Sequence, residues 1–242
     1  MVQVSVIIPT MNEEASIGRV LDDVHRALEP TPYDHELLVV DTRSVDRTVE
    51  IAEARGARVV QEDRRGYGRA YKTGFAAAQG AFLVTLDADA TYPAEAIPRF
   101  LRRLEAGWDF VSGDRMTRLD REAMEPHHRL GNAVLNWTVR LLYGVPIRDS
   151  QSGMWVFRRA ILDRLDLEND GMPFSEEIKL EVLAAGFRFL ELPIDYRPRL
   201  GEVKLRSWED GWANLRYLVR RRLSDSVRDP GAPPPGPGGR RG

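Results

Sequence analysis

Short, mostly apolar runs alternate with amphipathic segments along the first part of the chain. The runs at 2–8, 37–40 and 81–86 have the length of strands, and polar residues follow each of them. Between the runs, apolar positions three and four residues apart predict helices, for example over 17–28. Apolar strands that alternate with helices are typical of a parallel sheet covered on both faces. The pattern therefore predicts an α/β fold with a mostly parallel sheet and helices on both faces.

The second half of the chain has a less regular pattern of the same kind. Apolar runs predict strands at 110–113, 154–157 and 189–196. Helical spacing of apolar positions predicts helices over 129–143 and 175–185. We therefore expect these elements to belong to the same domain as the first half.

The C-terminal part of the chain differs from the rest in composition. We expect one domain over residues 1–204, an amphipathic helix over 205–225 and a disordered tail over 226–242, where Pro and Gly dominate. The helix has tryptophans and leucines on one side and most of its arginines on the other. Such a helix can pack its apolar stripe on the domain or lie in a membrane interface, and the sequence leaves both open.

The composition excludes several classes of function. Thirty-five basic residues balance 37 acidic ones, so the chain lacks the basic field that favours nucleic-acid binding, and we expect no nucleic-acid partner. It contains no cysteine, which excludes thiolate nucleophiles and sulfur-bound zinc. No stretch approaches the ~20 apolar residues that span a bilayer. We therefore expect a cytoplasmic protein whose membrane contact, if any, is peripheral at the cytoplasmic face.

Polar side chains follow three of the predicted strands. Glu13 follows the first strand, Asp41 ends the second, and Asp87 and Asp89 follow the third. Ligands of parallel sheets bind beyond the carboxyl ends of the strands, so we expect these side chains to gather at one edge. Asp87 and Asp89 are spaced so that their carboxylates can share Mg²⁺ or Mn²⁺. Taken alone, the same carboxylates could instead cap the helix that follows.

Ordered motifs give the chain a specific resemblance. They are the segments 4–14 (VSVIIPTMNEE), 39–48 (VVDTRSVDRT), 65–70 (RGYGRA) and 87–89 (DAD). Together they resemble the family-2 nucleotide-sugar glycosyltransferases, which have the Rossmann-like GT-A fold. Within that family the chain looks most like the dolichyl-phosphate mannose synthase branch, which includes polyprenyl-phosphate glucosyltransferases, and the resemblance covers residues 2–205.

The resemblance implies an activity and its cofactor. Enzymes of this branch transfer a hexose, mannose or glucose, from a GDP- or UDP-sugar to a polyprenyl or dolichyl phosphate with inversion. A divalent ion, Mg²⁺ or Mn²⁺, binds the diphosphate of the nucleotide sugar. By resemblance, the metal ligands would be Asp87 and Asp89, with Ala88 at the ribose and diphosphate. The nucleoside pocket would be lined by Pro9, Met11, Glu13, Val39 and Asp41.

The resemblance also implies residues for the acceptor and the leaving group. Arg115 and Arg129 would hold the acceptor phosphate, because the guanidinium fork binds phosphate bidentately. Arg199 and Lys204 would neutralise the departing nucleoside diphosphate, although Arg197 competes with Arg199 for this role. We take Asp89, Arg115 and Arg129 as the catalytic residues.

A phosphate acceptor reduces the chemistry that the protein must supply. A hydroxyl acceptor needs a general base, whereas a phosphate monoester, with a second pKa of about 6, is already ionised at neutral pH. Positioning and charge stabilisation then suffice. If the acceptor were a sugar or small-molecule hydroxyl, Asp149 or Glu177 would be the candidate base. Either side chain could also bond to neighbouring backbone.

The chain departs from the family's pattern at a few positions. Thr42 and Arg43 stand where the family often has Asp and Gly, and Thr91 stands where the synthases often have a metal-ligating Gln. These differences keep open a function of another class, a catalytically inactive subunit that binds a nucleotide sugar. The sequence does not choose between GDP and UDP or between mannose and glucose.

Overall fold

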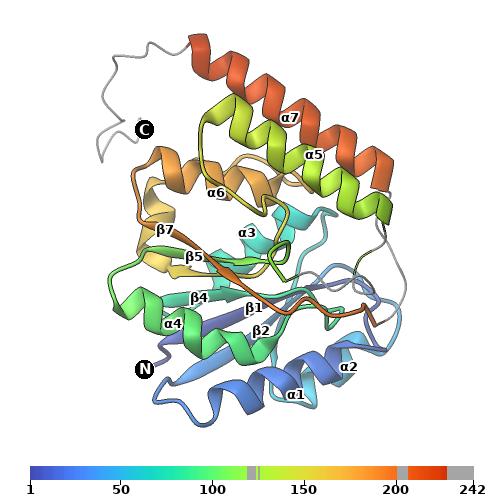
Figure 1. The fold of residues 1–242 in the computed structure, drawn as a ribbon. Helices are drawn as coiled ribbons and strands as arrows, with labels where there is room; N and C mark the ends of the chain where they lie inside the picture. Colours follow the sequence, from blue (N-terminus) through green and yellow to red (C-terminus); the bar gives the residue numbers. More distant parts are fainter. Residues whose placement is uncertain (119–123, 125, 201–206, 228–242) are drawn as a thin grey trace, which may run out of the picture.

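The computed structural model describes residues 1–118, 124, 126–200 and 207–227 (Figure 1). Within these ranges, a seven-stranded sheet has the order β3-β2-β1-β4-β6-β5-β7. Strands and helices alternate in the first half: β1 (Val4–Thr10), α1 (Ile17–Leu28), β2 (His35–Asp41), α2 (Thr48–Glu53), β3 (Arg58–Gln61), α3 (Tyr67–Ala77) and β4 (Phe82–Thr85).

The second half adds three strands and further helices. In chain order they are η1 (Ala94–Ala96), α4 (Ile97–Glu105), β5 (Phe110–Asp114), α5 (Pro126–Tyr143), β6 (Trp155–Arg158), η2 (Arg159–Arg164), α6 (Phe174–Ala184), β7 (Phe189–Pro193) and α7 (Ser207–Val227). The predicted α/β fold with a mostly parallel sheet is confirmed.

The strand directions bring six carboxyl ends to one edge of the sheet. β1 pairs in parallel with β2 and β4, β2 with β3, and β5 with β7. In the described sheet only β6 runs against its neighbours, β4 and β5. The segments that follow the parallel strands therefore leave the sheet at this edge, and the turn before β6 returns to it. α5 and α7 both begin on this side of the molecule, on the right of Figure 1.

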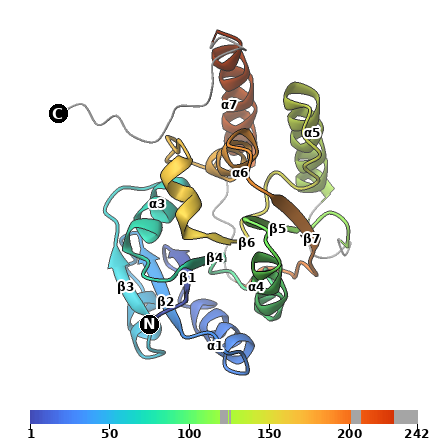
Figure 2. The ribbon, with the colours of Figure 1, turned by 90° about the vertical axis from the view of Figure 1, so that its left-hand side faces the viewer.

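Helices cover both faces of the sheet, as Figure 2 shows. On β1, Val6 and Ile8 point to the face covered by α1 and α4, whereas Ile7 points to the face covered by α3 and α6. This alternation is the two-residue period of a strand. Because both faces are buried, the strands must be apolar on both sides, which explains the uninterrupted runs in the sequence.

A third, smaller cluster joins α5, α6 and α7 at one end of the molecule. Its buried members are Leu135, Val139, Ile147, Leu180 and Leu218. The hydroxyl of Tyr143 on α5 donates to the carbonyl oxygen of Leu218 on α7 at 2.7 Å. α7 therefore packs on the domain through part of its surface.

The described residues cover only part of the chain to which the membrane and tail predictions apply. Among the helices that the structure describes, none is long and apolar enough to cross a membrane. Residues 228–242, which make up most of the predicted tail, lie outside the described residues. The division of the chain at residue 204 remains a prediction.

Candidate active site

The strand ends bring several of the predicted residues together. Asp87 and Asp89 follow β4, Arg115 follows β5, and Arg199 lies beyond β7. The charges of Asp89, Arg199 and Arg115 all act on the Asp87 carboxyl. Four of the proposed site residues thus form one electrostatic cluster at the carboxyl edge of the sheet.

Asp87 lies against two tyrosines of α3. Its Oδ1 accepts hydrogen bonds from the hydroxyls of Tyr71 at 3.2 Å and Tyr67 at 3.4 Å. Burial, followed by the negative charge of Asp89, raises the pKa of Asp87 to about 7. Two buried carboxylates repel each other, and a cation that both of them bind stabilises their ionised forms. The pair therefore fits a divalent metal ion.

Asp89 anchors the loop that follows β7. Its Oδ2 pairs with Nη2 of Arg199 at 2.7 Å, and its carbonyl oxygen accepts a bond from the backbone N–H of Leu200 at 2.9 Å. Arg197 pairs instead with Glu95. Of the two candidate arginines, Arg199 is the one that reaches the aspartate pair.

Thr91 is turned onto the carboxylate of Asp89. Its hydroxyl donates to Asp89 Oδ1 at 2.6 Å, and its backbone N–H donates to the same oxygen at 3.1 Å. The residue that stands in place of a metal-ligating Gln thus orients one of the two aspartates.

Gly153 presses the turn before β6 against Asp87. A Cβ at this position would lie 2.3 Å from the hydroxyl of Tyr67 and 3.3 Å from Oδ1 of Asp87. The backbone N–H of Gly153 donates to the hydroxyl of Tyr92 at 2.7 Å. A glycine is required here because any larger residue would displace the groups that hold Asp87.

Arg115 and Asp149 form a buried, bidentate ion pair. Nε and Nη2 of Arg115 each donate to one carboxylate oxygen at 2.8 Å, and its backbone N–H adds a third bond at 2.9 Å. Burial alone would raise the pKa of Asp149, but the charge and hydrogen bonds of Arg115 hold it below its usual range. An ionised carboxylate with both oxygens bonded to a guanidinium is a poor general base. The pair fixes Arg115, which has five N–H groups and uses two of them on Asp149.

Lys179 on α6 supports the same turn from inside the protein. Its Nζ donates to the carbonyl oxygens of Asp149, Ser150 and Ser152 at 2.7 to 2.9 Å. Burial lowers the pKa of Lys179 to about 8, against the opposing charge of Asp149. The sequence motifs do not point to this residue. Its one signal is a lysine between apolar positions of a helix, Ile178 and Leu180.

Glu177, the other candidate base, accepts hydrogen bonds from neighbouring backbone. Its Oε1 accepts a bond from the backbone N–H of Glu168 at 3.1 Å, and its Oε2 accepts one from the backbone N–H of Asn169 at 3.0 Å. Burial raises its pKa above the usual value. Its carboxylate thus closes the loop before α6.

The residues predicted to line a nucleoside pocket have different environments. The Val39 side chain is fully buried in the core. The Asp41 carboxylate accepts bonds from the hydroxyls of Ser44 at 2.5 Å and Thr10 at 3.0 Å. The remaining members are partly exposed at or just beyond the end of β1: Pro9, Met11 and Glu13.

Two predicted basic residues remain, Arg129 and Lys204. Arg129 lies, partly exposed, in the first turn of α5. Within the described part of the chain, no ion pair joins it to Asp87, Asp89 or Asp149. Lys204 lies outside the described residues. The acceptor role of Arg129 and the leaving-group role of Lys204 stay predictions.

Known proteins share much of this sequence. The low-salt glycan biosynthesis hexosyltransferase Agl6 of Haloferax volcanii is 37% identical over 218 residues, 89% of this chain and 52% of Agl6, so the chain spans about half of that relative. The dolichyl-phosphate hexose transferase of the same organism is 37% identical over 225 residues, 93% of this chain and 96% of the relative. The dolichol-phosphate mannosyltransferase of Pyrococcus furiosus is 29% identical over 229 residues, 90% of this chain and 63% of the relative.

Solved structures share the fold. Mannosyl-3-phosphoglycerate synthase from Rubrobacter xylanophilus has a TM-score of 0.73 at 20% identity and covers 96% of this chain and 79% of its own. Glucosyl-3-phosphoglycerate synthase from Mycobacterium tuberculosis, in complex with Mn²⁺, UDP and phosphoglyceric acid, has a TM-score of 0.70 at 22% identity, with the same coverage. The family model described as Glycosyl transferase family 2 matches residues 5–166. The resemblance found in the motifs is confirmed: the chain belongs to glycosyl transferase family 2 and has a GT-A-like fold.

Proposed function

We propose that this chain is an inverting hexosyltransferase that moves mannose or glucose from a GDP- or UDP-sugar to a polyprenyl or dolichyl phosphate. Two relatives at 37% identity, named a hexosyltransferase and a dolichyl-phosphate hexose transferase, support this proposal. The observation that carries the choice of acceptor is the ion pair of Arg115 and Asp149. Asp149 is held ionised and fully bonded, and Glu177 closes a loop. The site therefore suits an acceptor that arrives already ionised.

The donor diphosphate would lie beside Asp87 and Asp89. Mg²⁺ or Mn²⁺ bound to this pair would supply positive charge to the diphosphate oxygens. Among the described residues, no three His, Cys, Asp or Glu side chains gather as a metal site, so donor oxygens and water would complete the coordination. Arg199, already paired with Asp89, lies where it can add a second positive charge near the leaving group.

The acceptor phosphate would be bound by the N–H groups of Arg115 that Asp149 does not use. A phosphate oxygen attacks the anomeric carbon on the face opposite the diphosphate, and the bond from that carbon to the leaving oxygen breaks. No proton has to move, because both nucleophile and leaving group are anions. The protein's contribution is to align the reactants and to balance their charge.

A polyprenyl phosphate acceptor also has a consequence for the location of the enzyme. Polyprenyl phosphates reside in bilayers, so we propose that the protein acts peripherally at the cytoplasmic face of a membrane.

A matrix of donors and acceptors tests the proposal. GDP-mannose and UDP-glucose would each be paired with dolichyl phosphate and undecaprenyl phosphate, with Mg²⁺ or Mn²⁺, for the wild type, Asp89→Ala and Arg115→Lys. Asp63→Ala removes an exposed carboxylate that pairs with Arg43 and serves as the control. We expect lipid-linked hexose from one donor, lost in both site variants and retained in the control.

Two other results would overturn the proposal. Donor hydrolysis without lipid product would point to a hydroxyl acceptor. Donor binding without turnover on any acceptor would indicate the inactive subunit.

A further inference from the structure

Exposed apolar side chains are concentrated on two neighbouring helices. Of the nine large apolar side chains exposed in the described residues, seven belong to α5 and α7. On α5 they are Leu130, Val134, Trp137 and Leu141, and on α7 they are Trp212, Val219 and Leu223. We call these seven residues the outer stripes. Both tryptophans are more than 60% exposed, at 64% for Trp137 and 63% for Trp212.

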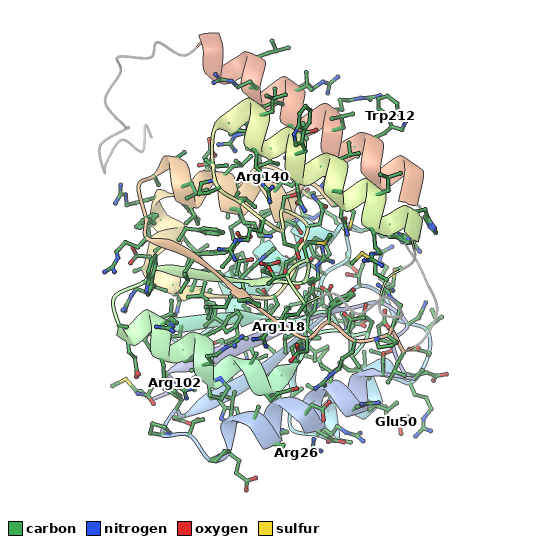
Figure 3. The ribbon with its side chains drawn as sticks, viewed as in Figure 1. Arg26, Glu50, Arg102, Arg118, Arg140 and Trp212 are labelled. Carbon is green, nitrogen blue, oxygen red and sulfur yellow. The ribbon has the colours of Figure 1, made fainter. Side chains whose placement is uncertain are left out.

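Each outer stripe is a second apolar face on a helix that already has a buried one. α5 packs inward through Leu135 and Val139, and α7 through Leu218. The outer residues follow one another at spacings of three, four or seven along their helices, so each set lies along one side. In Figure 3, Trp212 extends from α7 away from the sheet. A helix that only covers a core needs one apolar face, so the outer stripes call for another partner.

The charge on these helices favours an anionic partner. Residues 126–143 and 211–223 contain no Asp or Glu, and the acidic residues of α7 lie near its two ends, at Glu209, Asp210 and Asp225. The exposed Arg216 and Arg220 lie one and two turns after Trp212, beside the apolar stripe of α7. Aromatic and aliphatic side chains flanked by arginines are typical of helices that rest in the interface of an anionic bilayer.

The location of the stripes suits the proposed acceptor. α5 and α7 begin on the side of the molecule to which the parallel strands run, where Arg115 and Asp89 lie. A polyprenyl phosphate keeps its hydrocarbon chain in the bilayer and presents its phosphate at the surface. A docking face beside the site would let that phosphate reach Arg115 without leaving the membrane.

We propose that the outer stripes of α5 and α7, with Arg216 and Arg220, form a docking surface for an anionic lipid bilayer next to the active site. The link to catalysis rests on the proposed function, whereas the docking itself does not. A second copy of the chain is the other candidate occupant. A symmetric dimer through this face would bring the same arginines of two copies together, and like charges repel.

Vesicle flotation tests the docking independently of catalysis. The full chain would be mixed with vesicles of phosphatidylcholine alone or with 30% phosphatidylglycerol, without nucleotide sugar or polyprenyl phosphate. We expect flotation with the anionic vesicles and much weaker flotation with the neutral ones. Arg216→Gln/Arg220→Gln should lower the partition coefficient by about 30-fold. Trp137→Gln/Trp212→Gln should lower it by about 10-fold or more.

Matched variants on other surfaces control for unspecific effects. Arg102→Gln/Arg103→Gln removes two exposed arginines from α4, and Figure 3 shows Arg102 far from α7. Val45→Gln removes an exposed apolar side chain outside both helices. Because all substituted side chains are exposed, far-ultraviolet circular dichroism should confirm an unchanged fold. We expect both controls to float like the wild type.

Three results would overturn the docking surface. One is a wild type that stays in the aqueous fraction with anionic vesicles. A second is an equal loss of binding in the control variants. The third is a dimer in light scattering that the tryptophan substitutions convert to a monomer, since that result would assign the face to a second copy.

A separate assay distinguishes failure of docking from failure of the proposed function. Transfer to a short, water-dispersed isoprenyl phosphate does not need the bilayer, so the docking variants should keep it while losing transfer to vesicle-borne acceptor. Flotation without transfer to any acceptor would remove the proposed function and leave the docking surface standing.

Discussion

Asn214 of α7 donates a hydrogen bond of 2.9 Å from Nδ2 to Oε1 of Gln151. Gln151 lies in the turn whose Asp149 holds Arg115, and its own Nε2 donates to Oε1 of Glu176 at 2.5 Å. This chain of side chains ties the C-terminal helix to the candidate acceptor site. A helix that we propose to rest on a bilayer is thereby linked to the turn that orients the phosphate-binding arginine.

We expect Asn214→Ala to raise the KM for polyprenyl phosphate by about 5-fold, which corresponds to a hydrogen bond worth about 1 kcal/mol. The KM for the nucleotide sugar should change less, because the link reaches Gln151 rather than the aspartate pair. Steady-state kinetics with detergent-dispersed acceptor would measure both constants. Asn132→Ala, on the neighbouring α5, is the matched control. Equal changes in both variants would argue against a specific link.

The close packing of Gly153 against Tyr67 predicts that a substitution at Tyr67 can rescue a substitution at Gly153. Gly153→Ala should lower stability by about 1–3 kcal/mol and impair turnover, because the new methyl group overlaps the Tyr67 hydroxyl beside Asp87. Tyr67→Phe removes that hydroxyl, so the double variant should recover part of the stability that Gly153→Ala loses. Urea unfolding of the four proteins forms a double-mutant cycle. Strictly additive effects would disprove the overlap. Gly171→Ala, where a Cβ meets nothing closer than 3.5 Å, is the control.

Much of the sheet edge follows directly from the sequence. The apolar runs of β1, β2 and β4 are long enough to identify strands, and parallel carboxyl ends meet at one edge. The sequence alone therefore predicts that Asp87 and Asp89 share a site. The ordered motifs then identified the family, because each has its own place along the fold.

Contacts between distant residues could not be predicted in the same way. β6 has only three consecutive apolar residues before Arg158, and nothing in them specifies that the strand inserts antiparallel between β4 and β5. The sequence motifs imply separate roles for Arg115 and Asp149, yet the two residues form one ion pair across 34 positions. The same limit applies to Lys179, since its role depends on carbonyl groups that only the folded turn brings together.

The buried ion pair predicts a specific response to acid. The pKa of Asp149 is lowered in the folded state, whereas an unfolded Asp has a pKa of about 3.9. Its contribution to stability is therefore complete above pH 4 and is lost as pH falls through the folded pKa. Asp149→Asn should lower the free energy of unfolding at pH 7 by about 3–5 kcal/mol, because Arg115 is left buried without its partner. The gap to the wild type should narrow below pH 4.

A second variant keeps this prediction testable if Asp149→Asn fails to fold. Arg115→Met/Asp149→Leu removes both charges, and such replacements are often close to neutral for stability. The double variant should fold, lose the acid-sensitive contribution and fail to transfer hexose to a phosphate acceptor. Urea unfolding between pH 3 and 7 would measure the first two effects. Retained transfer would show that Arg115 does not bind the acceptor.

The environment of Glu176 predicts a pH dependence of stability opposite to that of Asp149. Burial raises its pKa to about 8, against the stabilising effects of Lys179 and Gln151. In the described structure its Oε2 is buried without a hydrogen-bond partner. When the folded state raises the pKa of an acid, the free energy of unfolding falls as pH rises from the unfolded pKa, about 4.3, to the folded pKa. In that pH window only the unfolded chain releases the proton.

Glu176→Gln should therefore stabilise the protein, with a gain that grows between pH 5 and 8 and reaches the order of a few kcal/mol. The amide keeps an oxygen for the bond from Gln151 and has no charge to bury. Urea unfolding at several pH values in this range would measure the gain. Glu168→Gln, at an exposed position eight residues earlier, is the control and should show no such trend. A constant difference between Glu176→Gln and the wild type across this range would mean that Glu176 titrates normally. The turn would then hold a charged carboxylate beside Lys179 at neutral pH.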